Sequence, residues 1–113
     1  MRLLIQRVSQ ASVHIENQLT AEIQSGLLVF VGIEQADQKS DVDWLVGKMI
    51  NMRIFEDDEG KMNLSLQDIK GSLLIVSQFT LHASTKKGNR PSFMKAAWPD
   101  LAIPLYEYFV DLC

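Results

Sequence analysis

Cysteine is almost absent from this sequence, and its scarcity excludes two kinds of chemistry. The single cysteine, Cys113, has no second cysteine to pair with, so neither an intramolecular disulfide nor a multi-cysteine metal site can form. A reducing compartment is therefore expected. The three prolines and six glycines are dispersed, and they form no linker, repeat or low-complexity segment.

A long apolar run is also missing. The segment from Met1 to Ile5 is too short for a signal peptide, and Gln6 and Arg7 interrupt it directly. No apolar stretch approaches the roughly 20 residues that a membrane-spanning helix needs. We therefore expect a cytoplasmic protein with no membrane partner.

The composition that is present is that of an ordinary globular protein. Apolar residues make up 47% of the 113 residues and charged residues 22%. This length suits one domain over residues 1–113. The net charge of −3 gives no general indication of nucleic-acid binding.

Alternating and continuous apolar patterns predict several short strands. Alternation over residues 2–8 and 11–16 predicts two strands, and a turn at Asn17-Gln18 would join the second to residues 19–23 in a hairpin. The apolar runs 27–33 and 73–76 do not alternate, which is typical of strands covered on both faces.

Two amphipathic helices are predicted. Ser40 can cap a helix that extends to Met52, and Trp44 lies off its apolar stripe, where we expect core packing. A terminal helix is predicted near Ile103 to Leu112. A start at Pro99 fits the apolar pattern as well, and it would make Pro104 an interior kink. Short strands and only two helices predict an α+β fold with a barrel-like, largely antiparallel sheet.

The four carboxylates that run from Glu56 to Glu59 are followed by Gly60. They lack the spacing of a calcium loop, so we expect a solvated turn with a left-handed glycine. We expect no metal and no cofactor in this chain.

The candidate site begins where the run 73–76 becomes polar. Ser77, Gln78 and Thr80 surround Phe79 at the end of a strand, which suits a binding crevice on a rigid support. The alternative is a strand end whose side chains cap their own backbone.

The segment from His82 to Lys95 carries four cationic side chains and no carboxylate, namely Lys86, Lys87, Arg90 and Lys95. Such a loop can contact phosphates or can be a solvated basic loop. His82 lies close to the polar strand end, but no nearby carboxylate fixes its tautomer. His14 occupies an outward strand position and is expected at the surface.

Five blocks in the same order carry a resemblance to a known family: Gln6-Arg7-Val8, Arg53-Ile54-Phe55, Gly60-Lys61-Met62-Asn63, Ser77-Gln78-Phe79-Thr80-Leu81 and Arg90-Pro91-Ser92-Phe93. The chain resembles the D-aminoacyl-tRNA deacylases, in register from Met1 to Cys113. The resemblance implies a cytoplasmic homodimer that hydrolyses the ester between a D-amino acid, or glycine, and the terminal adenosine of a tRNA.

The resemblance also implies roles for particular residues. Ser77, Gln78, Phe79 and Thr80 would line the pocket for the aminoacyl-adenosine end, with backbone N–H groups as oxyanion donors. Thr80 has no neighbouring base, so positioning is favoured over covalent catalysis, with the 2′-hydroxyl of the substrate assisting. Lys86, Lys87, Arg90 and Lys95 would contact the tRNA backbone, and Arg7 matches an arginine that holds a Gly-Pro motif in the family.

The chain departs from the family pattern in two respects. Family members continue for some thirty residues beyond the position of Cys113 and carry a Gly-Pro dipeptide that excludes L-amino acids, whereas the prolines here follow Arg90, Trp98 and Ile103. Trp98 replaces a small capping residue. The leading hypothesis is an editing hydrolase of the D-aminoacyl-tRNA deacylase type, and the alternatives are a tRNA-binding protein without turnover and a shortened product. Without the dipeptide we expect this chain either to fail to hydrolyse D-aminoacyl-tRNA or to hydrolyse D- and L-aminoacyl-tRNA with little preference.

Overall fold

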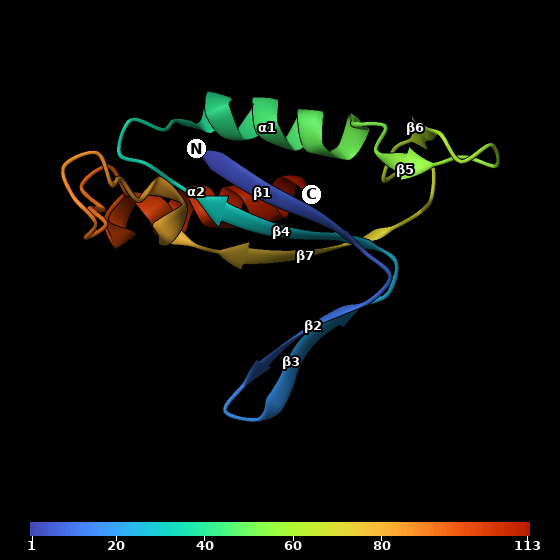
Figure 1. Ribbon diagram of the computed structural model, residues 1–113, viewed down its shortest axis with the longest axis horizontal. Coiled ribbons are helices and arrows are strands. Elements are labelled where there is room, and N and C mark those ends of the chain that lie inside the picture. Colours follow the sequence, from blue (N-terminus) through green and yellow to red (C-terminus); the bar gives the residue numbers. More distant parts are fainter. The chain divides into compact units, whose positions relative to one another are not determined.

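The computed structural model describes residues 1–113 (Figure 1). The elements in chain order are β1 (Arg2–Val8), β2 (Ala11–Ile15), β3 (Gln18–Ile23), β4 (Gly26–Gly32), α1 (Lys39–Asn51), β5 (Phe55–Glu56), β6 (Met62–Leu64), β7 (Ser72–Ser77), the 3₁₀ helix η1 (Phe79–His82) and α2 (Pro99–Leu112).

The contacts divide the chain into two compact units, each with its own buried residues. Unit 1 comprises Met1–Leu4, Phe30–Val46 and Val76–Cys113, and unit 2 comprises Ile5–Val29 and Gly47–Ile75. No helix of the chain is both long enough and apolar enough to span a bilayer.

Unit 2 contains the predicted hairpin. β2 and β3 pair antiparallel, with a register shift between Val13 and His14. The turn is formed by Glu16 and Asn17, which have positive φ angles of 52° and 64°, so it lies one residue earlier than Asn17-Gln18. Two consecutive positive φ angles match the twist of a two-residue hairpin turn.

The acidic turn of unit 2 is ordered by its own backbone. β5 and β6 pair antiparallel on either side of it. The Asp57 carboxylate accepts hydrogen bonds from the N–H groups of Glu59 at 2.9 Å and Lys61 at 3.1 Å. Gly60 has a φ of +75°, as expected for a turn residue that needs the left-handed region.

The three-stranded sheet has the order β1-β4-β7, with β4 in the middle. The Ser72 N–H donates to Ser25 O and the Gln78 N–H donates to Val31 O. The constant offset between these residues makes β7 parallel to β4, whereas the two smaller sheets are antiparallel. The α+β prediction is confirmed, and the strands are distributed over three sheets, none of them closed.

Burial differs between the two apolar runs. β4 is buried along nearly its whole length, as predicted for a central strand. In β7 only Leu74 is buried, while Leu73, Ile75 and Val76 are partly accessible. Both faces of this run are therefore covered only in part, less than predicted, and β7 lies at an edge of the sheet.

The first helix follows its predicted stripe but differs in two details. In unit 1 the stripe residues Val42 and Val46 are buried. Trp44 is 64% exposed, so core packing is wrong for it, as its position off the stripe allows. Ser40 lies inside α1, and the capping carboxylate is that of Asp41, which accepts from the Gln38 N–H at 2.8 Å.

The second helix begins at Pro99, so the predicted start near Ile103 is wrong and the alternative start applies. Pro99 occupies its first turn, Pro104 lies in its interior, and Leu105 and Phe109 are buried. The N–H groups of Leu101 and Ala102 both donate to Trp98 O, which closes the first turn. In unit 1 the Tyr108 hydroxyl donates to the Asp43 carboxylate, which links α2 to the first half of α1.

Candidate functional site

The predicted site residues lie at the end of β7 and in the 3₁₀ helix η1. Ser77 ends the strand, Gln78 is extended, and Phe79 and Thr80 begin η1. Two hydrogen bonds of unit 1 hold this turn: the Gln78 N–H donates to Val31 O at 2.8 Å, and the Arg2 guanidinium donates to Leu81 O at 2.7 Å. Ends of two other strands therefore fix its position.

Gly32 allows η1 to approach the end of β4 closely. A Cβ atom at this position would lie 2.8 Å from the Cβ of Leu81 and 3.2 Å from the carbonyl oxygen of Gln78. The first distance is shorter than real Cβ atoms show and the second is tighter than usual, so a side chain at this position would force Leu81 to move. The close approach of the candidate site therefore depends on glycine here.

Gln78 and Thr80 interact through their side chains. The Gln78 amide Nε2 donates a hydrogen bond to the Thr80 hydroxyl. Gln78 therefore makes no side-chain cap to the backbone of η1. The partner of the Thr80 hydroxyl is an amide rather than a base, so nothing in this pair raises its nucleophilicity.

Phe79 opens onto an apolar cleft. Its ring packs edge to face against Phe93, with 5.2 Å between the ring centroids and 71° between the planes. The cleft has a volume of about 520 Å³, and its lining includes Phe79, Phe93, Met94 and Trp98. Trp98 is 71% exposed. Because three of the lining residues are aromatic, we call this surface the aromatic cleft.

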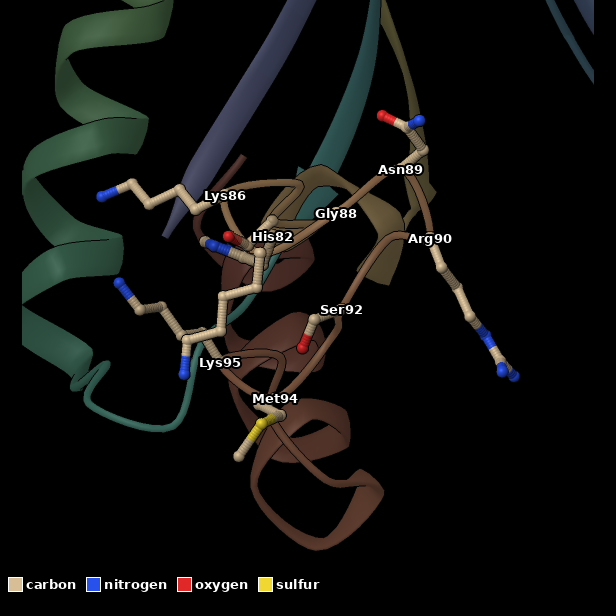
Figure 2. A pocket seen from close by; sticks show the side chains of 10 residues that line it. His82, Lys86, Gly88, Asn89, Arg90, Ser92, Met94 and Lys95 are labelled. Carbon is tan, nitrogen blue, oxygen red and sulfur yellow. The ribbon is translucent and has the colours of Figure 1, made fainter.

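A second and larger cavity lies on the basic segment (Figure 2). We call it the basic cavity. It has a volume of about 660 Å³ and is lined by His82, Ser84, Lys86, Lys87, Gly88, Asn89, Arg90, Ser92, Met94 and Lys95. The structure thus brings all four predicted cationic residues to one cavity, without a carboxylate.

The basic segment is closed into a loop by its own backbone. Ser84 and Ser92 exchange two hydrogen bonds of 2.8 Å, each N–H donating to the carbonyl oxygen of the other residue. The side chains then diverge: Lys86 and Lys95 extend to one side of the loop, whereas Asn89 and Arg90 point to the other (Figure 2).

His82 lines the basic cavity and lies beside a carboxylate, which its neighbours in the sequence did not predict. It is only 4% exposed. Its Nδ1 lies 3.6 Å from Oε2 of Glu34, and its Nε2 has no hydrogen-bond partner. The sequence offered a carboxylate only far from His82 in the chain, so local pattern could not pair the two residues.

Arg7 belongs to unit 2. Its guanidinium Nη1 donates to Ile54 O at 2.9 Å, which ties β1 to the segment before β5.

The structure contains no cluster of metal-ligating side chains: no group of three or more His, Cys, Asp or Glu side chains converges within residues 1–113.

Known proteins resemble this chain over nearly its whole length. It is 67% identical over 110 residues to a D-aminoacyl-tRNA deacylase of Flavobacterium johnsoniae, covering 97% of this chain and 73% of the relative. It is 61% identical over 109 residues to a protein of the same name from Akkermansia muciniphila, covering 96% and 73%.

Solved structures agree in fold. The c-Myc DNA unwinding element binding protein superposes with a TM-score of 0.94 at 35% identity, over 99% of this chain and 75% of that one. A probable eukaryotic D-amino acid tRNA deacylase superposes with a TM-score of 0.80 at 21% identity, over 96% and 64%. The profile of the D-Tyr-tRNA(Tyr) deacylase family matches residues 4–113, and the chain belongs to this family.

Proposed function

We propose that this protein hydrolyses the ester bond of D-aminoacyl-tRNA, releasing the free amino acid and tRNA as a proofreading step in translation. Membership of the D-Tyr-tRNA(Tyr) deacylase family supports the reaction class. The observation that carries the proposal is the polar strand end of β7 in the same unit as a carboxylate-free basic cavity. Glycine on a mischarged tRNA is a second substrate of the same chemistry.

The chemistry assigned to the strand end is positioning and charge stabilisation. Ester hydrolysis passes through a tetrahedral oxyanion, which needs hydrogen-bond donors at fixed positions. The leading N–H groups of a 3₁₀ turn have no partner within the turn, and no side chain caps those of η1. Phe79 and Thr80 begin this turn, so their N–H groups are the proposed oxyanion donors.

The tRNA strand would meet the cationic side chains of the basic cavity. Lys86, Lys87, Arg90 and Lys95 offer point charges and forked donors for phosphates. Because the proposed substrate serves ribosomal translation, the protein would act in the cytoplasm.

We also propose a homodimer. Phe79, Met94 and Trp98 are 57%, 86% and 71% exposed, which is unusual for large apolar side chains gathered at one cleft. A second copy would cover this surface. Analytical ultracentrifugation over a range of micromolar concentrations measures the oligomeric state. A monomer at every concentration would contradict the proposed homodimer.

The reaction is tested with D-tyrosyl-tRNA and with its L counterpart. Release of D-tyrosine catalysed by the protein is the expected result. Binding of tRNA without release would instead support the alternative of a binding protein without turnover.

The role of Thr80 is tested separately with two variants. Thr80→Ser keeps a hydroxyl and Thr80→Val removes it. If Thr80 only positions the site, Thr80→Val should lower kcat by about tenfold or less, because one hydrogen bond to Gln78 is lost. A loss on the order of a thousandfold, restored by serine, would identify Thr80 as the nucleophile instead.

A further inference from the structure

His82 carries a buried nitrogen that no group of the protein satisfies. The side chain is 2% exposed, and its Nε2 lacks a hydrogen-bond partner. Buried polar atoms are nearly always paired, because an unpaired one loses the hydrogen bonds it would make in water. His82 lines the basic cavity, but its Nε2 is closed to solvent. A ligand that enters the cavity and displaces the atoms covering Nε2 would supply the missing partner.

The opposite nitrogen of His82 faces a carboxylate. Nδ1 lies 3.6 Å from Oε2 of Glu34. Glu34 and Asp37 also face the N-terminal ammonium of Met1, at 3.8 and 2.6 Å. Nδ1 therefore faces an acceptor. An imidazole that carries a proton on each nitrogen would donate from Nδ1 to Glu34 and from Nε2 to an acceptor in the cavity.

The remaining lining of the cavity selects an anion. Apart from Met94 and Gly88, the residues that accompany His82 carry cationic side chains or neutral ones with a donor, including Ser84 and Ser92, and none is a carboxylate. Lys86 and Lys95 extend to the same side of the loop (Figure 2). Phosphate oxygens accept several charge-assisted hydrogen bonds at once, which fits such a set of donors.

We propose that the basic cavity is a binding site for a single phosphate group, with Nε2 of His82 as its buried donor and Lys86 and Lys95 as its ammonium partners. This inference rests on the proposed function for its source of phosphate, the diester next to the terminal adenosine of the tRNA. A free nucleotide would offer the same chemistry. His82 is thus a positioning residue for the substrate strand.

The test uses two dinucleotides that differ in one charge. The probes are cytidylyl-adenosine and its methylphosphonate analogue, in which the linkage is neutral. The native protein should bind the phosphodiester about tenfold tighter, because a hydrogen bond between charged groups is lost in the analogue. His82→Ala should lower this preference without abolishing it, because Lys86 and Lys95 still favour the charged linkage, and His82→Gln, which keeps a donor, should restore part of the loss.

Matched controls separate a ligand contact from a structural role. His14→Ala removes the other histidine of the chain, an exposed residue of β2, and should leave the preference unchanged. The preference is a ratio within one variant, so a partly destabilised His82→Ala protein still gives a valid reading. Equal loss of both probes on His82→Ala, or no preference in the native protein, would overturn the proposal.

Two further arms identify the source of the phosphate. Sulfate should compete with the phosphodiester probe, and a failure to compete overturns an anion site. Tighter binding of cytidylyl-adenosine than of adenosine 5′-monophosphate supports the strand as the source, and the reverse order overturns that part. None of these measurements requires hydrolysis, so a failure of the deacylase function would be seen separately.

Discussion

Ser65 and Asp68 stabilise the connection that precedes β7 through two reciprocal hydrogen bonds. The Asp68 carboxylate accepts from the Ser65 N–H at 2.9 Å, and the Ser65 hydroxyl accepts from the Asp68 N–H at 3.2 Å. This is the arrangement of a capping box. The Ser65 N–H, then its hydroxyl and more weakly the charge of Arg53 lower the pKa of Asp68 from its ordinary value of 3.8.

Asp68→Asn should therefore lower thermal stability at neutral pH and not in acid. A carboxyl whose pKa is lowered by folding contributes stability above its unfolded value of 3.8, and this contribution is lost as the pH falls through the folded pKa. The midpoint of unfolding, measured at pH 7 and near pH 2, checks this. Asp58→Asn, in the acidic turn, is the charge-matched control, and an equal difference between Asp68→Asn and native protein at both pH values would contradict the explanation.

At the level of elements, α2 contains a proline in its interior. Pro104 lies beyond the first turn, where a residue would normally donate its N–H to the carbonyl of Asp100, and proline has no N–H to donate. The helix forms nevertheless because Leu105 and Phe109 are buried on its inner face. Burial of the apolar face of α2 therefore outweighs the unfavourable helix propensity of proline.

Pro104→Ala should raise the free energy of unfolding by about 2 kcal/mol, because an exposed interior position gains a backbone hydrogen bond and a better helix former. Urea unfolding followed by circular dichroism measures the change. Pro99→Ala is the matched control: at the first helical position the missing N–H has no intrahelical partner, so little gain is expected there. A loss of stability in Pro104→Ala would show that the proline makes a favourable contact that outweighs its cost to the helix.

On the scale of the whole molecule, charge is separated. The chain carries a net charge of −3, yet the lining of the basic cavity holds four cationic residues and no carboxylate. A local field of this kind attracts a phosphate backbone despite the overall sign. The affinity for a nucleic acid must then fall as ionic strength rises, because binding releases counterions from the nucleic acid.

The double variant Lys86→Ala/Lys95→Ala should flatten the salt dependence of tRNA binding. Each lost phosphate contact reduces the slope of log K against log salt by about 0.7–0.9. The slope is obtained from the affinity for tRNA, measured at several salt concentrations between about 50 and 200 mM. Lys61→Ala is the control, because Lys61 lies in the β5–β6 turn and pairs with Glu59. A slope equal to that of the native protein would leave the basic segment as a solvated loop.

Local patterns in the sequence were enough for most of the elements. β1 has the predicted bounds, the hairpin forms within one residue of its predicted turn, and α1 follows its stripe. These features depend on residues a few positions apart, whose spacing sets which side chains share a face. The family could also be recognised from the sequence, because the order and spacing of the five blocks are properties of the chain alone.

The chemistry of the basic cavity depends instead on residues that are distant in the sequence. Glu34 meets His82 because β4 leads to one and β7 to the other, and these strands pair in parallel. The close approach of η1 at Gly32 also joins residues that are far apart in the chain. Local spacing predicts none of these contacts, since strand pairing and side-chain packing bring such residues together only when the whole unit folds.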